Sequence, residues 1–451
     1  MAVLADRDAP QQVSAADLDA VVSDLVGDVC RAALSPKDGS GYDWWKVLFA
    51  LYPNSKATHS TRPRERGVLQ KGVEELFTPD GSGSATLPCT FCGAGASVVW
   101  GKSNLPLFDT SKALNTLPPG IAGWPVCRGC RVAMWALPYG SWVTVGSATV
   151  LSCESTAAER EFAQRNVRRA RRIMQAGFTG LPVGARPEYV ALVALRDAGT
   201  DLCATTLLSF KNDNQEPWLR VTRTRRAVGV FMARVDANAP LRRGWHLLAR
   251  ALTRHDTQGR VVASGAQEAA RLVFEAEDGA SRSLLRQLFE LLQDANRSWS
   301  SGDREALARL ASAFAKEVLG MDTDLAPVAT LIADWIAGGS SPRGRFAEYR
   351  NAALSDYKLG ALLMQAYSRL LLDGSSVQLA GPEGWEPLIR RRPRAWEQRM
   401  LLFAQVSVLL QQRGVTIGEK PDSPEEQRRI DELENRPMLD EDVFDYEMGP
   451  A

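Results

Sequence analysis

The stretches Cys89-Thr90-Phe91-Cys92 and Cys127-Arg128-Gly129-Cys130 are two Cys-X-X-Cys pairs separated by 34 residues. Four thiols in two such pairs are typical of a structural zinc site, in which the metal is tetrahedral and keeps no open position. Gly93 follows the first pair and Gly129 lies inside the second. Glycine permits the tight turn that aims backbone N–H groups at thiolate sulfur. We therefore predict one structural zinc ion, bound by Cys89, Cys92, Cys127 and Cys130.

The gap between the pairs exceeds the roughly 15–20 residues of a compact zinc ribbon, so the metal is expected to close a long loop. The alternatives are a thioredoxin-like redox pair and two unrelated thiol clusters. One pair would suffice for redox work, and neither pair opens an evident strand-helix-strand unit. We expect the zinc module to span about residues 80–145, after the linker Gly81-Ser82-Gly83-Ser84.

The remaining cysteines, Cys30, Cys153 and Cys203, stand singly in apolar or helical contexts, which favours buried structural thiols. A chain without a disulfide framework is typical of a reducing compartment. The N-terminus lacks the basic start and apolar core of a signal peptide, and no apolar run approaches the roughly 20 residues that span a bilayer. We expect a soluble, cytoplasmic protein without a membrane partner.

Two helices are predicted in the N-terminal half. Residues 14–34 place apolar side chains at helical spacing behind Ser14, a favourable N-cap residue. The capping box Thr156-Ala157-Ala158-Glu159 predicts a second helix, which ends at Gly177. The aromatic-rich run at 41–52 is expected to contribute to the core.

Three strands are predicted next, at residues 189–195, 202–210 and 218–226, and the first two are expected to form a hairpin. Beyond about Ala239 the pattern turns helical. The predicted helices lie near residues 240–254, 265–276, 281–296, 303–318, 324–337, 343–372 and 393–413.

These patterns predict an α+β fold. A mixed α/β N-terminal body at 1–240 carries the inserted four-cysteine zinc-finger loop, a C-terminal helical bundle follows at 241–417, and an acidic disordered tail occupies 418–451. The chain has 451 residues and a formal net charge of +1, but residues 161–260 hold 18 Lys and Arg against 8 Asp and Glu. Residues 415–451 hold 4 against 12. This asymmetry favours a polyanion-binding body and a solvated acidic tail.

Basic side chains are candidates for contact with nucleic acid. Four arginines of the predicted helix 156–176 lie three or four positions apart and share one face. Other candidates lie on the third predicted strand and in the polar loop 54–66. Two more, Lys102 and Asn104, lie in the zinc loop. The alternative for the loop is a solvated connector without a binding role. The alternative for the helix is that its arginines pack against protein. The candidates are Asn54, Lys56, Arg62, Arg64, Arg66, Lys102, Asn104, Arg165, Arg168, Arg169, Arg172, Arg220 and Arg226.

Signals for catalysis are weak. The run Trp100-Gly101-Lys102-Ser103 is similar to the end of a phosphate-binding loop, but Ala96 stands where the first glycine is required. The His255-Asp256 pair has few possible co-ligands, because the chain contains three histidines. We therefore expect a protein that is not an enzyme.

Taken together, several segments resemble the large subunit of the subtype I-B CRISPR Cascade complex, of the Cst branch. They are Trp44-Trp45, Tyr52-Pro53-Asn54-Ser55, Cys89-Thr90-Phe91-Cys92-Gly93, Trp124-Pro125-Val126-Cys127-Arg128-Gly129-Cys130 and Met134-Trp135-Ala136-Leu137-Pro138-Tyr139-Gly140. The similarity covers roughly residues 40–145, and the remainder agrees in architecture, with later helices similar to the family's small subunit.

The resemblance implies a non-catalytic subunit of an RNA-guided DNA surveillance complex in antiviral defence. Such subunits cap the 5′ handle of the guide RNA, recognise the protospacer-adjacent motif in duplex DNA and position a separate helicase-nuclease. The implied partners are guide RNA, target double-stranded DNA, the backbone, handle-binding and small subunits, and the helicase-nuclease. The loop Asn54–Arg66, with Lys102 and Asn104, is expected to read the adjacent motif.

Two other classes fit the same residues. A zinc-containing DNA- or RNA-binding regulatory protein would also combine a basic body with four cysteines, and it would bind nucleic acid without partner proteins. A metal-dependent nuclease is the enzyme alternative, and it would cleave nucleic acid when supplied with a divalent cation.

Overall fold

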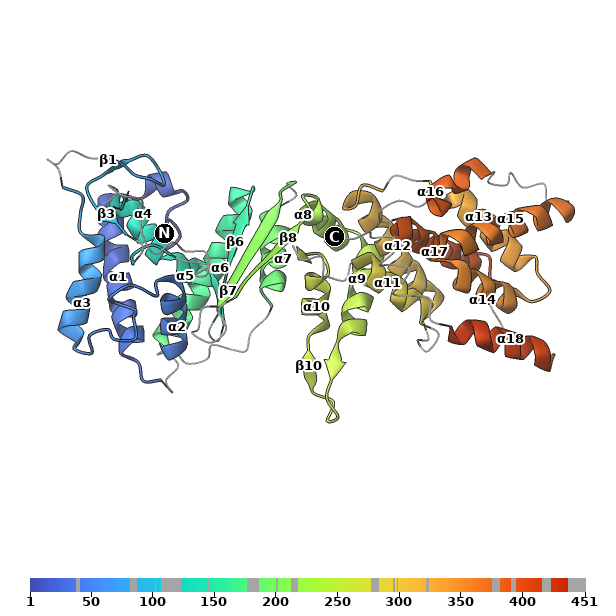
Figure 1. The fold of residues 1–451 in the computed structure, drawn as a ribbon, viewed down its shortest axis with the longest axis horizontal. Coiled ribbons are helices and arrows are strands. Elements are labelled where there is room, and N and C mark those ends of the chain that lie inside the picture. Colours follow the sequence, from blue (N-terminus) through green and yellow to red (C-terminus); the bar gives the residue numbers. More distant parts are fainter. Residues whose placement is uncertain are drawn as a thin grey trace. The chain divides into compact units, whose positions relative to one another are not determined.

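The computed structural model describes residues 1–37, 41–81, 87–101, 103–106, 123–144, 147–176, 186–199, 202–211, 218–276, 284–294, 297, 299–321, 324–374, 382–390, 395–415 and 423–436. The chain divides into two compact units, and each is considered by itself (Figure 1). The first comprises Met1–Gly229 with Phe274–Ala280, and the second Val230–Val273 with Ser281–Ala451. The predicted α+β class is confirmed, with the four cysteines in the N-terminal half and helices in the C-terminal part.

The first unit contains helices and short strands. Its helices are η1 (Pro10–Gln12), α1 (Ala15–Leu34), α2 (Gly41–Leu51), α3 (Arg66–Glu74), η2 (Glu75–Phe77), α4 (Arg128–Trp135), α5 (Leu137–Gly140), α6 (Thr156–Gln175) and α7 (Pro187–Ala198). Its strands are β1 (Leu87–Pro88), β2 (Gly95–Ala96), β3 (Val99–Trp100), β4 (Trp124–Pro125), β5 (Trp142–Thr144), β6 (Ser147–Cys153), β7 (Thr205–Lys211), β8 (Trp218–Thr224) and β11 (Glu275–Ala276).

Five of these strands form an antiparallel sheet in the order β11-β8-β7-β6-β5. The longest pairing joins β7 to β8, from Thr205 opposite Thr224 to Lys211 opposite Trp218. Helix α6 packs against β6, and α7 packs against α6 (Figure 1). One core of buried apolar residues joins α1–α4 to β5, β6 and α6, and it includes Cys89 and Trp135. The cysteine-bearing segment is therefore built into the N-terminal core.

Helix starts follow local capping chemistry. Ser14 and Asp17 form the capping box of α1, as the predicted N-cap requires. Helix α6 begins one residue earlier than expected, because the Ser155 hydroxyl accepts from the Ala158 N–H. The Glu159 carboxylate accepts from the Cys153 N–H. The predicted box of Thr156 and Glu159 is thus replaced by a Ser155 cap.

The predicted strand 189–195 is wrong, because this segment is helix α7. Pro187 stands at the first turn, where its fixed φ and missing N–H suit a helix start. The run from Val190 to Leu195 is apolar throughout, and such a run does not distinguish a buried strand from a buried helix. The predicted hairpin with 202–210 is therefore absent, and β7 pairs instead with β6 and β8.

The second unit is mainly helical. Its helices are α8 (Val228–Ala237, which starts at the unit boundary), α9 (Ala239–Leu252), α10 (Gly265–Arg271), α11 (Leu284–Gln293), α12 (Ser301–Glu317), α13 (Ala326–Ala337), α14 (Pro342–Ala352), α15 (Asp356–Leu372), η3 (Pro382–Trp385), α16 (Glu386–Ile389), α17 (Ala395–Gln412) and α18 (Pro424–Asn435). Strands β9 (Arg254–His255) and β10 (Val261–Ala263) form a hairpin between α9 and α10.

Helix α17 is the centre of this bundle and contacts α11, α12, α13 and α16. Its buried residues lie on every side, as expected of a helix enclosed by others. Phe403 packs edge-on to Phe289 at 5.0 Å and stacks on Tyr349 at 5.6 Å between ring centroids. Helices α9 and α12 cross closely at Gly244, where a Cβ atom would lie 2.5 Å from the Ala306 carbonyl oxygen.

Three predictions beyond Ala239 need correction. The helix predicted at 265–276 ends at Arg271, and Glu275–Ala276 form strand β11. The long helix predicted at 343–372 is two helices, because Ser355 caps a new helix by accepting from the Lys358 N–H. The predicted disordered tail includes α18, which packs against α14 and buries Ile430. The Arg343 guanidinium donates to both carboxylate oxygens of Glu434 at 2.8 and 2.9 Å, and this contact raises the pKa of Arg343. Residues 437–451 lie outside the described part.

Replacing Ile430 with Ala is expected to loosen α18. The residue is 1% exposed, so its truncation removes apolar contacts worth about 2 kcal/mol, roughly thirtyfold in a local opening equilibrium. Hydrogen exchange of the α18 amides measures this opening. Glu432→Ala, at an exposed position of the same helix, is the matched control and should retain protection. Equal protection in both variants would show that α18 does not depend on this contact.

Candidate metal centre

The first Cys-X-X-Cys pair lies in the turn between strands β1 and β2. The Cys89 N–H donates to the Ala94 carbonyl at 2.7 Å, and the Gly93 N–H donates to the Cys89 carbonyl at 2.9 Å. Gly93 has a φ of +76°, which an L side chain rarely adopts. The glycine after the pair therefore permits the tight turn, as the sequence predicted.

The second pair lies where strand β4 passes into helix α4. Strand β4 pairs with β3, and Cys127 is the N-cap of α4, so Cys130 falls in its first turn. The Thr90 N–H donates to the Pro125 carbonyl at 2.9 Å and ties the two pairs together through the backbone. The Val126 N–H likewise donates to the Val98 carbonyl at 2.9 Å.

The four cysteine sulfurs converge, and we call Cys89, Cys92, Cys127 and Cys130 the cysteine cluster. All four sulfurs lie within 4.8 Å of one another, and those of Cys92 and Cys127 are 3.6 Å apart. A tetrahedral zinc ion with Zn–S distances of about 2.3 Å separates its sulfurs by about 3.8 Å. A disulfide would bring two sulfurs to about 2.05 Å. The spacing thus suits four thiolates around one metal ion.

The charges of the cluster also favour a cation. Burial opposes ionisation of Cys89, but backbone N–H groups of Cys127, Phe91 and Cys92 outweigh it and lower the Cys89 pKa to about 6. Burial, followed by contacts with the other thiols, raises the pKa of Cys130 far above its usual range. Burial also raises the pKa of Cys127. Several thiolates at this spacing repel one another, and a metal ion among them would supply the compensating positive charge.

A buried guanidinium supports the second pair. The Arg131 side chain is fully buried and donates to the carbonyls of Leu76, Thr78 and Val126 at 2.8–3.1 Å. It also forms an ion pair with Asp80 at 3.0 Å. Burial lowers the pKa of Arg131, yet each donated bond compensates part of the desolvation.

Asp80 connects both halves of the metal-binding segment. Its carboxylate accepts from the Arg128 N–H at 2.7 Å and from the Ser97 N–H at 3.3 Å. Burial acts to raise the Asp80 pKa, but these backbone bonds and Arg131 lower it overall. Neither Asp80 nor Arg131 was predicted from the sequence. No sequence signal distinguishes Arg131 from Arg128, because the Leu76 and Thr78 carbonyls that Arg131 reaches lie more than fifty positions earlier in the chain.

Aromatic packing joins α4 to the N-terminal core. The Trp135 ring stacks on Tyr52 with centroids 4.2 Å apart and planes 8° apart. The Tyr52 hydroxyl donates to the Met134 carbonyl at 2.6 Å. Trp44, Trp45 and Tyr52 thus belong to the same core as Cys89.

The candidate residues of loop 54–66 are not all exposed. Asn54 and Lys56 are exposed, as are Arg64 and Arg66, and Arg64 reaches the Ala33 carbonyl at 3.4 Å. Arg62 is buried, lies 4.1 Å above the Trp45 ring and donates to the Ala33 carbonyl at 2.8 Å. Its guanidinium is used inside the fold, so it is a structural residue.

The four arginines predicted to share one face of α6 also differ in their contacts. Arg165 forms ion pairs with Glu161 at 2.9 Å and with Asp197. Arg169 lies 3.9 Å over the Trp142 ring and donates to the Val143 carbonyl at 2.6 Å, and burial lowers its pKa to about 10. Arg168 and Arg172 are exposed. Half of this face therefore serves internal packing.

Three further candidates lie outside the cysteine cluster. Arg220 is exposed on β8 and lies 3.5 Å from Glu188, and Arg226 pairs with Glu154 at 2.9 Å. Asn104 is half-buried, in a turn where its N–H donates to the Gly101 carbonyl at 3.1 Å. Lys102 lies outside the described residues.

The chain matches no protein-family model, no curated protein and no solved structure. Within the described ranges, the cysteine cluster is the group of His, Cys, Asp or Glu side chains arranged to share one metal ion. No helix in the described part of the chain has the length and apolarity to cross a membrane.

Replacing Arg131 with Met is expected to destabilise the metal-binding segment by about 3–5 kcal/mol, because Asp80 and buried carbonyls lose their donors. Urea unfolding and hydrogen exchange of residues 76–80 and 95–100 measure the loss. Arg66→Met, at an exposed position of the same unit, should change stability by less than about 0.5 kcal/mol. A similar small change in Arg131→Met would refute this role for the guanidinium.

Proposed function

We propose that the cysteine cluster binds one zinc ion and that this ion is structural. Support comes from the donors, since four thiolates in a tetrahedron suit zinc and fill every coordination position. With no position left for water or substrate, the ion would act by holding the two Cys-X-X-Cys pairs together. Binding energy of such a site is folding energy, because the unfolded chain has no preformed site.

The ion would fix the ends of the loop between the pairs. Backbone bonds from Thr90 and Val126, together with Asp80, already align the two pairs. Helix α4 is in turn fixed to the core, because its Trp135 ring stacks on Tyr52. The metal would thereby hold residues 93–101 and 123–126, the described ends of this loop, in fixed positions on the packed core.

We further propose that the protein binds nucleic acid as the non-catalytic large subunit of a subtype I-B Cascade. The family rests on the sequence resemblance, and Arg168 and Arg172 carry the proposal of nucleic-acid contact. These arginines are four positions apart, exposed, and in no ion pair with a described carboxylate. Exposed guanidinium groups on one helix face suit phosphate neutralisation.

In this role, the first unit would contact the guide-RNA handle or the entering duplex, and a helicase-nuclease recruited to the complex would cut. Base pairing with the guide RNA would supply sequence specificity, so the protein needs to read only the adjacent motif and nucleic-acid shape. Asn54, Lys56, Arg64 and Arg66 remain candidates for the motif, since all four are exposed. Arg62 no longer qualifies, because its guanidinium is buried.

The purified chain is expected to carry about one zinc ion, and Cys127→Ser is expected to lose it, because the fourth thiolate is removed. Elemental analysis after purification without chelator measures the content. Cys153→Ser is the matched control, because Cys153 lies outside the cysteine cluster and its sulfur already contacts the Thr205 hydroxyl and the Ser155 N–H. Zinc retained by Cys127→Ser, or absent from the unmodified chain, would contradict the site.

Replacing both Arg168 and Arg172 with Ala is expected to weaken binding to all nucleic-acid sequences alike. Each lost phosphate contact should reduce the slope of log K against log salt by about 0.9. The measurement is a salt titration of the chain assembled with guide RNA and partner subunits. Arg369→Ala with Arg390→Ala, at exposed positions of the second unit, is the control.

An unchanged slope in the α6 double variant would refute the phosphate contacts. Tight, specific binding by the chain alone would instead favour a regulatory nucleic-acid-binding protein. Cleavage that depends on a divalent cation would favour a nuclease.

A further inference from the structure

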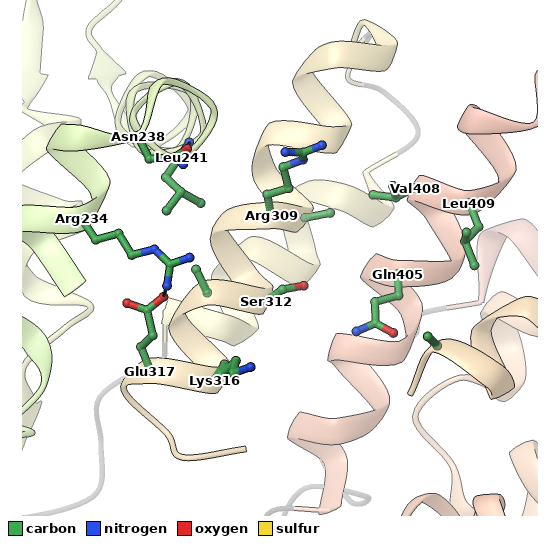
Figure 2. A pocket seen from close by; sticks show the side chains of 13 residues that line it. Arg234, Asn238, Leu241, Arg309, Ser312, Lys316, Glu317, Gln405, Val408 and Leu409 are labelled. Atoms are coloured by element: carbon green, nitrogen blue, oxygen red, sulfur yellow. Dashed lines mark hydrogen bonds and ion pairs between the residues drawn. The ribbon is translucent and has the colours of Figure 1, made fainter. Parts of the chain in front are cut away.

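The second unit contains a groove that nothing above explains. It has a volume of about 460 Å³ and lies between α12 and α17, with α8 and α9 at one side (Figure 2). We call it the α12–α17 groove. Small or apolar side chains form its walls, including Leu241, Ala308, Ala313, Val408 and Leu409.

Cationic side chains outnumber carboxylates among the residues that line the groove. Arg234, Arg309 and Lys316 line it against one lining carboxylate, Glu317, which pairs with Arg234 (Figure 2). Arg309 also pairs with Glu305 at 2.6 Å, yet its side chain is 56% exposed. The cations are therefore accessible to an acidic ligand.

Gln405 places a hydrogen-bond acceptor inside the groove. Its side chain points from α17 toward α12 (Figure 2). The carbonyl oxygen of this side chain is buried and accepts no hydrogen bond from a described residue. A buried acceptor is costly unless a donor reaches it. The backbone N–H of a peptide is such a donor, so the groove suits an acidic peptide with apolar side chains.

The chain itself contains such a peptide at residues 437–451, which we call the C-terminal segment. It holds five carboxylate side chains and no Lys or Arg. It also holds the apolar or aromatic residues Leu439, Val443, Phe444 and Tyr446. Its charge and apolar content therefore complement the groove.

The C-terminal segment is also within reach. It follows α18, where the Arg350 guanidinium donates to the carbonyls of Glu434 and Arg436 within the second unit. Fifteen residues extend about 50 Å, whereas a compact unit of this size has a radius of gyration of about 17 Å. A tether this short gives effective concentrations on the order of millimolar, so weak contacts suffice.

We propose that the α12–α17 groove is the docking site of the C-terminal segment of the same chain. The carboxylates of the segment face Arg309 and Lys316, its apolar side chains cover Leu241 and Val408, and a backbone N–H reaches Gln405. This docking is independent of zinc binding and of nucleic-acid binding.

The test uses the full chain with p-benzoylphenylalanine in place of Phe444. Irradiation followed by peptide mass spectrometry is expected to locate crosslinks on residues 308–316 and 405–409. Mixing with isotope-labelled chain that lacks the photoreactive residue separates crosslinks within a chain from those between chains. Crosslinks within a chain at these residues support the proposal.

A matched pair of variants tests the charge complementarity. Arg309→Glu with Lys316→Glu should lower the crosslink yield at least about fivefold, because two attractions become repulsions. Lys358→Glu with Arg390→Glu reverses two exposed cations outside the groove and should leave the yield unchanged. Raising the salt concentration should lower the yield as well.

Three outcomes would overturn the proposal. Absence of crosslinks, or crosslinks at other surfaces, would show that the segment does not dock here. Crosslinks found solely between chains would assign the groove to a second copy. Equal yields from both charge-reversal variants would remove the charge complementarity on which the assignment rests.

Discussion

Four thiols held within 4.8 Å are the constraint on which the first unit depends. Their sulfurs come from the β1–β2 turn and from the start of helix α4, and 34 residues separate the two Cys-X-X-Cys pairs. Two short strand pairs, β1 with β2 and β3 with β4, align the turns with two residues in each strand. Such short pairings are weak alone. A cation among the thiolates would convert mutual repulsion into the strongest local attraction in the segment.

The first unit also uses arginines as internal supports. Arg131, Arg62 and Arg169 each donate to a backbone carbonyl, and two of them lie over tryptophan rings. Guanidinium groups suit this role because they are planar, present several donors and are less strongly hydrated than ammonium groups. The basic composition of the segment therefore does not translate directly into a basic surface. A count of charges along the sequence overstates the cations that a polyanion can reach.

The fold and site were predictable where their causes are local. The Cys-X-X-Cys pairs and Gly93 encode turns and ligands within a few residues, so the cluster followed from spacing alone. The burial of Arg62 depends on the Ala33 carbonyl, 29 positions away, and no local pattern announces it. Helix α7 was not predicted, because a continuous apolar run shows neither the 3.6-residue period of a helix nor the two-residue period of a strand. Helix α18 was missed because acidic composition outweighed the Ser423 cap and Pro424 start.

Strand β11 has a consequence for the order in which the chain is made. It pairs with β8 at the edge of the five-stranded sheet, yet residues 230–273, which belong to the second unit, come between the two strands. During synthesis from the N-terminus, one edge of β8 stays unpaired until residues 275 and 276 have left the ribosome. Unpaired edges invite pairing with other chains. The first unit is therefore most exposed to misassembly while the first part of the second unit is being made.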